Sequence, residues 1–134
     1  MDSQKNIETV KQLYANVVAK NLDGVFSSLT DDIRWEPPYV PEIAHTKLRV
    51  GKDGVKNWII EMAGEVNYSQ VTPQAIYADN NAVIVKGYFE GTANNTGKAF
   101  ASDWVHIWKF RDDKICGYQA FWNTHNVLNA LTSR

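Results

Sequence analysis

The sequence predicts a single α+β domain spanning residues 1–134, in which a curved antiparallel sheet wraps around N-terminal helices. Two observations support this fold class. Apolar residues recur at helical spacing in the first half of the chain, and beyond Gly64 they recur with a period of two. Short polar segments join the later strands, and such hairpin connections make neighbouring strands antiparallel. Helices followed by an antiparallel sheet pack as layers, so we expect a cone with an open end.

The first half of the chain is predicted to contain three helices and one short strand. The expected elements are helices over residues 6–20, 22–29 and 51–64 and a strand over 32–36. Asn21 or Asp23 caps the second helix. Pro37 and Pro38 stop the strand, because proline cannot donate to a ladder. Residues 39–50 show no clear period and are expected to form a long loop, of a kind that often carries function.

The second half is predicted to form four strands and a closing helix. We expect strands over residues 66–78, 82–92, 97–111 and 114–123 and a helix over 124–133. The third of these strands is far longer than the usual five or six residues, so we expect it to bend. A long bent sheet leaves space at one end of the cone, where a small ligand could bind.

Composition and charge argue against several classes of function. The formal net charge is −1 and no run of Lys or Arg occurs, so no nucleic acid partner is expected. The apolar stretches are too short to span a bilayer, and the polar start of the chain does not resemble a secretory signal. Cys116 is the single cysteine, which rules out an internal disulfide and fits a reducing compartment. We therefore expect a cytoplasmic protein without a membrane partner.

Metal and cofactor sites are not expected either. The three histidines are dispersed, without a second His or Cys at ligand spacing. His45 in its long loop could reach the mouth of the cone, but an exposed side chain is favoured. The sequence contains no phosphate-binding loop, dinucleotide fingerprint or nucleophile elbow. It therefore predicts no metal and no bound cofactor.

The third predicted strand concentrates aromatic residues on one face. That face consists of Phe100, Ser102, Trp104, His106, Trp108 and Phe110. It is too apolar to face water, so we place it toward the helices, where it lines the cone. His106 then lies among tryptophans, and burial favours its neutral form, which offers one donor and one acceptor to a ligand. The alternative is a buried histidine that is bonded to a tyrosine or a backbone carbonyl.

Several stretches resemble the nuclear-transport-factor-2-like superfamily, and more narrowly its SnoaL-like and ketosteroid-isomerase-related branch. These stretches are residues 10–14, 21–26, 31–37, 91–97, 103–110 and 121–124, in this order. The resemblance covers nearly the whole chain and implies a cystatin-like cone. The superfamily includes isomerases, cyclases, dehydratases, epoxide hydrolases and members without chemistry, so function has to be argued from the site.

The resemblance implies roles for three side chains. His106 falls where ketosteroid isomerase has a protonated carboxylic acid that donates to the developing oxyanion. Glu36 matches the position of the general-base aspartate, and Tyr14 roughly matches the oxyanion-hole tyrosine. Taken as residues alone, Glu36 could be an ordinary solvated carboxylate, and Tyr14 could be a core tyrosine with its hydroxyl tied to a neighbour.

Further residues are expected to line the site. They are Trp35, Trp58, Met62, Phe89, Trp104, Trp108, Tyr118, Trp122 and Asn123. The resemblance implies that related sequences usually carry an acidic residue in the stretch 122–124, which takes part in proton transfer in some SnoaL-like cyclases; here the residue is Asn123. An asparagine cannot act as a general base, so that chemistry is either absent here or uses Glu36.

The sequence thus favours a pocket protein for a small hydrophobic molecule, as a cofactor-free isomerase, cyclase or dehydratase acting on a hydrophobic carbonyl compound. A non-catalytic binding protein for an apolar ligand is the second hypothesis, and a dimeric interaction module is the third. On the outer face of the third strand, Val105 and Ile107 lie between Asp103 and Lys109. A half-apolar sheet face commonly marks a partner surface, so we expect a homodimer through it.

Overall fold

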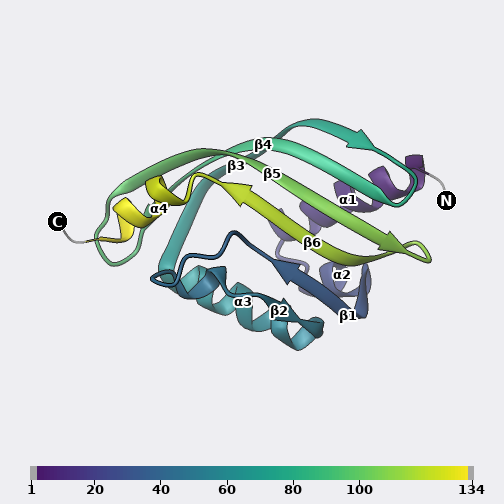
Figure 1. The fold of residues 1–134 in the computed structure, drawn as a ribbon, viewed down its shortest axis with the longest axis horizontal. Coiled ribbons are helices and arrows are strands. Elements are labelled where there is room, and N and C mark those ends of the chain that lie inside the picture. The colour runs from purple at the N-terminus through teal and green to yellow at the C-terminus, as the bar shows by residue number, and fades with distance from the viewer. Residues whose placement is uncertain (1–2, 133–134) are drawn as a thin grey trace.

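The computed structural model describes residues 3–132 and confirms the α+β class (Figure 1). Its helices are α1 (Ser3–Val18), α2 (Leu22–Ser27), the short 3₁₀ helix η1 (Ala44–Thr46), α3 (Gly51–Glu65) and α4 (Thr124–Leu131). Its strands are β1 (Leu29–Glu36), β2 (Arg49–Val50), β3 (Val66–Ala78), β4 (Ala82–Ala93), β5 (Ala99–Arg111) and β6 (Lys114–Trp122). The four strands of the second half begin and end within two residues of their predicted limits.

The six strands form one curved, unclosed sheet in the order β2-β1-β6-β5-β4-β3. Strands β3 to β6 pair antiparallel, as their hairpin connections require. β1 lies parallel to β6, so the sheet is mixed rather than wholly antiparallel. β1 comes before α3 in the chain and has no hairpin link to β6, so no short connection imposes an antiparallel pairing on these two strands.

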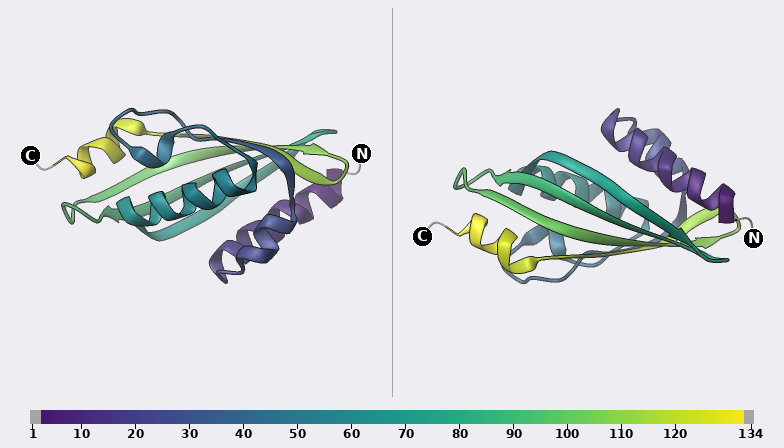
Figure 2. Two further views of the ribbon diagram at one scale, coloured as in Figure 1. Left: turned by 90° about the horizontal axis from the view of Figure 1, so that it is seen from below. Right: turned by 90° about the horizontal axis from the view of Figure 1, so that it is seen from above.

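α1 and α3 cover the same face of the sheet (Figure 2). α1 packs against β3 and β4, whereas α3 packs against β1. Along β5, every second residue from Phe100 to Phe110 faces these helices and is buried, except for the half-buried His106. The core therefore lies between the inner face of the sheet and the two helices, as the alternation in β5 predicts.

Several boundaries of the helices and of β1 differ from the predicted ones, and α1 spans Ser3–Val18 instead of 6–20. β1 begins at Leu29, which the helical periodicity assigns to the second helix; its side chain is buried, and the pairing with β6 is irregular between Leu29 and Arg34. α3 continues through Gly64 and ends at Glu65. α4 ends at Leu131, and its predicted end at residue 133 lies outside the described residues. None of the described helices is long and apolar enough to cross a membrane.

The long loop after β1 is ordered by a buried threonine. The hydroxyl of Thr46 accepts a hydrogen bond from the Val40 N–H at 2.9 Å and lies 2.7 Å from the carbonyl oxygen of Ile43. Thr46 and Ile43 are both fully buried. The loop, which includes η1, therefore contributes buried residues to the core, although it has no sequence period.

Candidate functional site

Aromatic rings from three neighbouring strands line the inner face of the sheet. Trp104 and Trp108 of β5 are each 1% exposed, and their register partners on β6 are Trp122 and Tyr118. Residues directly opposite one another on paired strands share a face, which brings these rings together. β1 adds Trp35, whose ring stacks on Tyr118 with 4.0 Å between the ring centroids. These five predicted lining residues form one connected inner surface, which we call the aromatic interior.

Three further predicted lining residues adjoin this surface. Trp58 of α3 packs on Trp35 with 5.2 Å between the ring centroids. Met62, one helical turn later, packs against the same core. Phe89 of β4 is buried and contacts the ring of Trp122 edge-on at 6.2 Å. The aromatic interior therefore extends from β4 across the sheet to α3.

Asn123 lies outside the aromatic interior. Its side chain is exposed and accepts a hydrogen bond from the N–H of Asn126 at 3.1 Å, which makes it the N-cap of α4. Its backbone N–H donates to the hydroxyl of Ser102 at 2.8 Å. Asn123 thus stabilises the start of a helix.

Tyr14, His106 and Trp108 form a hydrogen-bonded chain inside the protein. The Tyr14 hydroxyl lies 2.8 Å from Nδ1 of His106 and 3.0 Å from Nε1 of Trp108. An indole nitrogen can only donate, so the Tyr14 oxygen accepts from Trp108. The hydroxyl proton of Tyr14 remains available as a donor, and Nδ1 of His106 is the acceptor within reach. Tyr14 therefore donates to Nδ1, so that each of these buried polar atoms has a partner. Nε2 of His106 then carries the ring hydrogen.

The surroundings of His106 keep this arrangement neutral. Its ring stacks on Trp104 with 3.9 Å between centroids and meets Tyr118 edge-on at 5.1 Å. Although part of the residue remains exposed, burial among these rings lowers the pKa of His106 to about 3. Burial also raises the pKa of Tyr14, against a smaller opposite effect of the hydrogen bond from Trp108. At neutral pH the structure therefore holds a neutral phenol beside a neutral imidazole.

Three indole N–H groups in this region are buried and have no partner among the described residues. They belong to Trp35, Trp58 and Trp104. Buried polar groups in folded proteins are nearly always bonded, so each of these donors calls for an explanation. Donors without protein acceptors are suited to the oxygen atoms of a bound molecule or of water.

Glu36 does not join Tyr14 and His106. It follows Trp35 in β1, and successive residues of a strand point to opposite faces, so Glu36 lies on the outer face of the sheet. There it is opposite Gln119 in register, and Oε1 lies 3.6 Å from Nε of Arg34. It borders an open hollow of about 430 Å³ between β6 and the loop after β1. The structure therefore does not bring the predicted base to the predicted oxyanion group.

A second histidine, which belongs to this loop and is expected from the sequence to be exposed, is buried. His45 of η1 is 2% exposed, so the expectation of an exposed loop histidine was wrong. Its Nδ1 lies 2.7 Å from Oε1 of Glu65, the last residue of α3, and the ring of Trp122 stacks against it at 6.5 Å. Nε2 of His45 is buried and has no hydrogen-bond partner within residues 3–132. Burial lowers the pKa of His45, although the hydrogen bond and charge of Glu65 act in the opposite direction.

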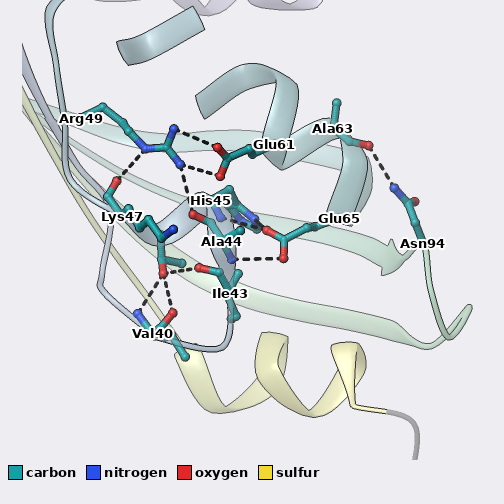
Figure 3. Close-up of polar contacts among 11 residues, drawn as sticks. Val40, Ile43, Ala44, His45, Lys47, Arg49, Glu61, Ala63, Glu65 and Asn94 are labelled. Carbon is teal, nitrogen blue, oxygen red and sulfur yellow. Dashed lines mark hydrogen bonds and ion pairs between the residues drawn. The ribbon is translucent and has the colours of Figure 1, made fainter. Parts of the chain in front are cut away.

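Glu65 and a neighbouring ion pair tie the loop to α3 (Figure 3). The Glu65 carboxylate also accepts the backbone N–H groups of His45 at 2.9 Å and Ala44 at 3.2 Å. Arg49 donates to both carboxylate oxygens of Glu61, at 2.8 and 3.3 Å, and to the Ala44 carbonyl at 3.1 Å. These contacts hold the His45 ring in one orientation.

One signal in the sequence points to this cluster. An acidic residue at the end of a helix opposes the negative end of the helix dipole, so Glu65 needs a local partner. The backbone N–H of Asn94 bonds the Glu65 carbonyl at 2.9 Å, and its side chain bonds the Ala63 carbonyl at 3.0 Å, which satisfies two carbonyl groups at the end of α3. The Glu65 carboxylate, which can only accept, finds its donors in the loop. No group of three or more His, Cys, Asp or Glu side chains within residues 3–132 is arranged to hold a metal ion.

A sequence profile of the SnoaL-like domain matches residues 10–118 of the chain. The chain belongs to this family. The matched span includes Tyr14, His45, Glu65 and His106, so both histidine clusters lie within the family domain. A comparison with curated protein sequences found no match.

Solved structures support the same fold. An NTF2-like protein from Burkholderia xenovorans is 22% identical with a TM-score of 0.88, covering 98% of this chain and 99% of its own. TerC, co-crystallised with polyporic acid, is 22% identical with a TM-score of 0.84, covering 95% of this chain and 98% of its own. A Bacillus subtilis protein proposed to be an isomerase is 25% identical with a TM-score of 0.81, covering 100% of this chain and 98% of its own.

Proposed function

We propose that this SnoaL-like protein binds a small hydrophobic carbonyl compound in its aromatic interior and catalyses a cofactor-free proton transfer on it. The observation that carries the proposal is the chain from Trp108 through Tyr14 to His106. That chain directs the hydroxyl proton of Tyr14 at Nδ1 of His106 and leaves Nε2–H of His106 without a partner among the described residues. A neutral imidazole N–H fixed in this way suits an oxygen that becomes negative during reaction.

The chemistry follows from that donor. When a base removes the proton from a carbon beside a carbonyl group, the electron pair moves to the carbonyl oxygen and forms an enolate. The hydrogen bond from Nε2 of His106 stabilises the enolate more than the ketone, because the oxygen carries more charge. Return of the proton to a different carbon completes an isomerisation. No electron is gained or lost, so the sequence of steps needs no redox partner.

Two further observations support an oxygen-bearing, flat ligand. The unpartnered indole N–H groups of Trp35, Trp58 and Trp104 are donors that a ligand oxygen could satisfy. Among the structural relatives, TerC was crystallised with polyporic acid, and a protein from Bacillus subtilis is proposed to be an isomerase. The isomerase, cyclase and dehydratase reactions expected from the sequence all share the same proton-transfer step.

Deuterium uptake from deuterium oxide into β-tetralone, followed by proton NMR, tests the proposed function. This ketone is flat and apolar, and its benzylic carbon beside the carbonyl exchanges a proton through an enolate. We expect the protein to accelerate uptake and His106→Asn, which removes the Nε2 donor, to reduce the acceleration about a hundredfold. Absence of acceleration by the wild-type protein, together with absence of β-naphthol binding, would contradict the proposed function.

The second candidate function is a binding protein without catalysis, and the position of Glu36 favours it. The predicted base lies on the outer face, so the Tyr14–His106 pair could hold a ligand oxygen without any base nearby. β-Naphthol, an aromatic analogue of the enol of β-tetralone, separates the two candidates in isothermal titration calorimetry. Saturable binding of β-naphthol without accelerated deuterium uptake would support the binding protein, whereas binding with uptake supports the enzyme.

A further inference from the structure

We propose that His45, held by Glu65, is the proton acceptor of the site and replaces Glu36 in that role. This inference rests on the proposed function and adds the base that it requires. His45 comes from the loop between β1 and α3, whereas His106 comes from β5. The two imidazoles border the aromatic interior from different elements.

The hydrogen bonds of Glu65 determine which nitrogen of His45 carries the hydrogen. Oε1 of Glu65 lies 2.7 Å from Nδ1 of His45 and 2.9 Å from its backbone N–H. An ionised carboxylate can only accept, so Nδ1 of the neutral ring donates to it. Nε2 of His45 therefore carries a lone pair. His106 has the opposite tautomeric role, because Tyr14 donates to its Nδ1 and leaves Nε2–H as a donor.

The His45 ring borders the aromatic interior, in which the ligand is proposed to bind. Nε2 of His45 is buried and has no partner in the part of the chain that the structure describes. The His45 ring faces Trp122, with 28° between the ring planes. Trp122 is the register partner of Trp104, and Trp104 stacks on His106 at 3.9 Å. His45 thus contacts Trp122 and His106 contacts Trp104, two tryptophans that are paired across β5 and β6.

Anchoring of the loop does not by itself account for His45. The backbone N–H groups of Ala44 and His45 already tie η1 to Glu65, so the loop is held whatever side chain stands at position 45. Burying a second ring nitrogen without a partner costs free energy, and a packing role would be served by an apolar side chain. Carboxylate-to-imidazole bonding is the usual way in which proteins orient a histidine that accepts a proton.

The charged groups around His45 agree with its role as a base. Glu65 bonds the ring, and Arg49 and Glu61 act on it through their charges. Burial outweighs the effect of Glu65 and holds the pKa of His45 below its ordinary value. The ring is therefore neutral at neutral pH and able to take a proton. In the reaction, Nε2 takes the proton from the carbon beside the carbonyl, and the Glu65 carboxylate stabilises the imidazolium until Nε2 returns that proton.

His45→Asn is the most selective test of the base. The amide N–H of asparagine can donate to Glu65 as Nδ1 does, while the basic nitrogen is removed. We expect deuterium uptake into β-tetralone to fall about a hundredfold or more, with the melting temperature and β-naphthol binding largely retained. His125→Asn is the matched control, because His125 is exposed on α4 and, within residues 3–132, bonds only Asn129. That variant should match the wild-type rate.

Glu65→Gln tests the positioning residue. Loss of the negative charge lowers the pKa of His45 further, so the acidic limb of the pH–rate profile should move to lower pH and the maximal rate should fall about tenfold. A residue that only anchors the loop would change stability without moving the profile. If His45→Asn takes deuterium into β-tetralone at the wild-type rate, this inference is overturned and the proposed function stays intact. Wild-type protein that neither binds β-naphthol nor accelerates uptake would overturn both.

Discussion

The hydroxyl of Tyr14 lies 2.8 Å from Nδ1 of His106, and this contact joins helix α1 to strand β5. Trp108 donates to the same hydroxyl at 3.0 Å. One oxygen thus satisfies an indole donor and an imidazole acceptor in a region where unpaired groups are costly. The contact also fixes the tautomer of His106, so a structural bond determines which hydrogen is offered to a ligand.

Tyr14→Phe is expected to weaken both the fold and the site. It leaves Nδ1 of His106 and Nε1 of Trp108 without partners, which should lower the free energy of unfolding by about 1–3 kcal/mol. Urea denaturation monitored by circular dichroism measures this loss. Deuterium uptake into β-tetralone should also fall, because the His106 ring can then adopt either tautomer. An unchanged rate in a destabilised variant would show that the tautomer is immaterial.

Acid is expected to destabilise the protein through His106. Burial lowers its pKa from 6.5 to about 3, so between these pH values the unfolded chain binds a proton that the folded chain does not. The free energy of unfolding therefore falls as the pH falls through this window. The buried His45 acts in the same direction. Urea denaturation at a series of pH values should show a shallower decline for His106→Asn than for the wild type, and parallel curves would contradict this assignment.

Most of the fold could be predicted because its elements have a sequence period. The alternation in β5 correctly predicts which of its residues face inward, and the polar joints correctly predict the hairpins. The pairing of β1 with β6 has no such local signal, because it joins segments far apart in the chain and without a short connection. Leu29 continues the helical spacing of α2 but is the first residue of β1, so the helical and strand periods overlap at this position.

The candidate site could be predicted only in part. Tyr14 and His106 lie on elements with a clear period, and the structure brings them into contact. Trp35 and Glu36 are neighbours on one strand and cannot face the same side, so the sequence alone already argues against placing both in the site. His45 lies in a loop without a sequence period, so no pattern predicts that its side chain is buried. Its position depends on Glu65, which follows it by twenty residues and bonds it only in the folded chain.

The close approach of Trp104 to β4 gives a prediction for Gly87. These two residues are register partners, and a Cβ at position 87 would overlap the Trp104 indole and approach the Thr72 carbonyl. Gly87→Ala should therefore lower the free energy of unfolding by about 1–3 kcal/mol through overpacking. The near-ultraviolet circular dichroism of the tryptophans should change with it. Chemical denaturation compared with the wild type measures the loss.

Gly64→Ala is the matched control for this substitution. Gly64 lies in the last turn of α3, and a Cβ there would meet no atom within 4 Å. Alanine favours a helix over glycine by up to about 1 kcal/mol, so this variant should be at least as stable as the wild type. An equal loss of unfolding free energy in both alanine variants would contradict the argument that Trp104 occupies the space that a Cβ at position 87 would need.

The outer face of the sheet allows a direct test of the expected homodimer. Ile107 of β5 is the register partner of Ile84, and Val105 is the register partner of Phe121. Ile84 and Phe121 are 38% and 47% exposed, so a stripe of apolar surface crosses three strands.

We expect light scattering after size exclusion to give about twice the 15.2 kDa mass of the chain. Ile107→Lys should give the monomer mass, because it would bury an unpaired charge in the interface. Val71→Lys, on the edge strand β3 opposite the inward-facing Phe89, should remain dimeric. A wild-type protein with the monomer mass would overturn the expected homodimer and show that this stripe faces solvent.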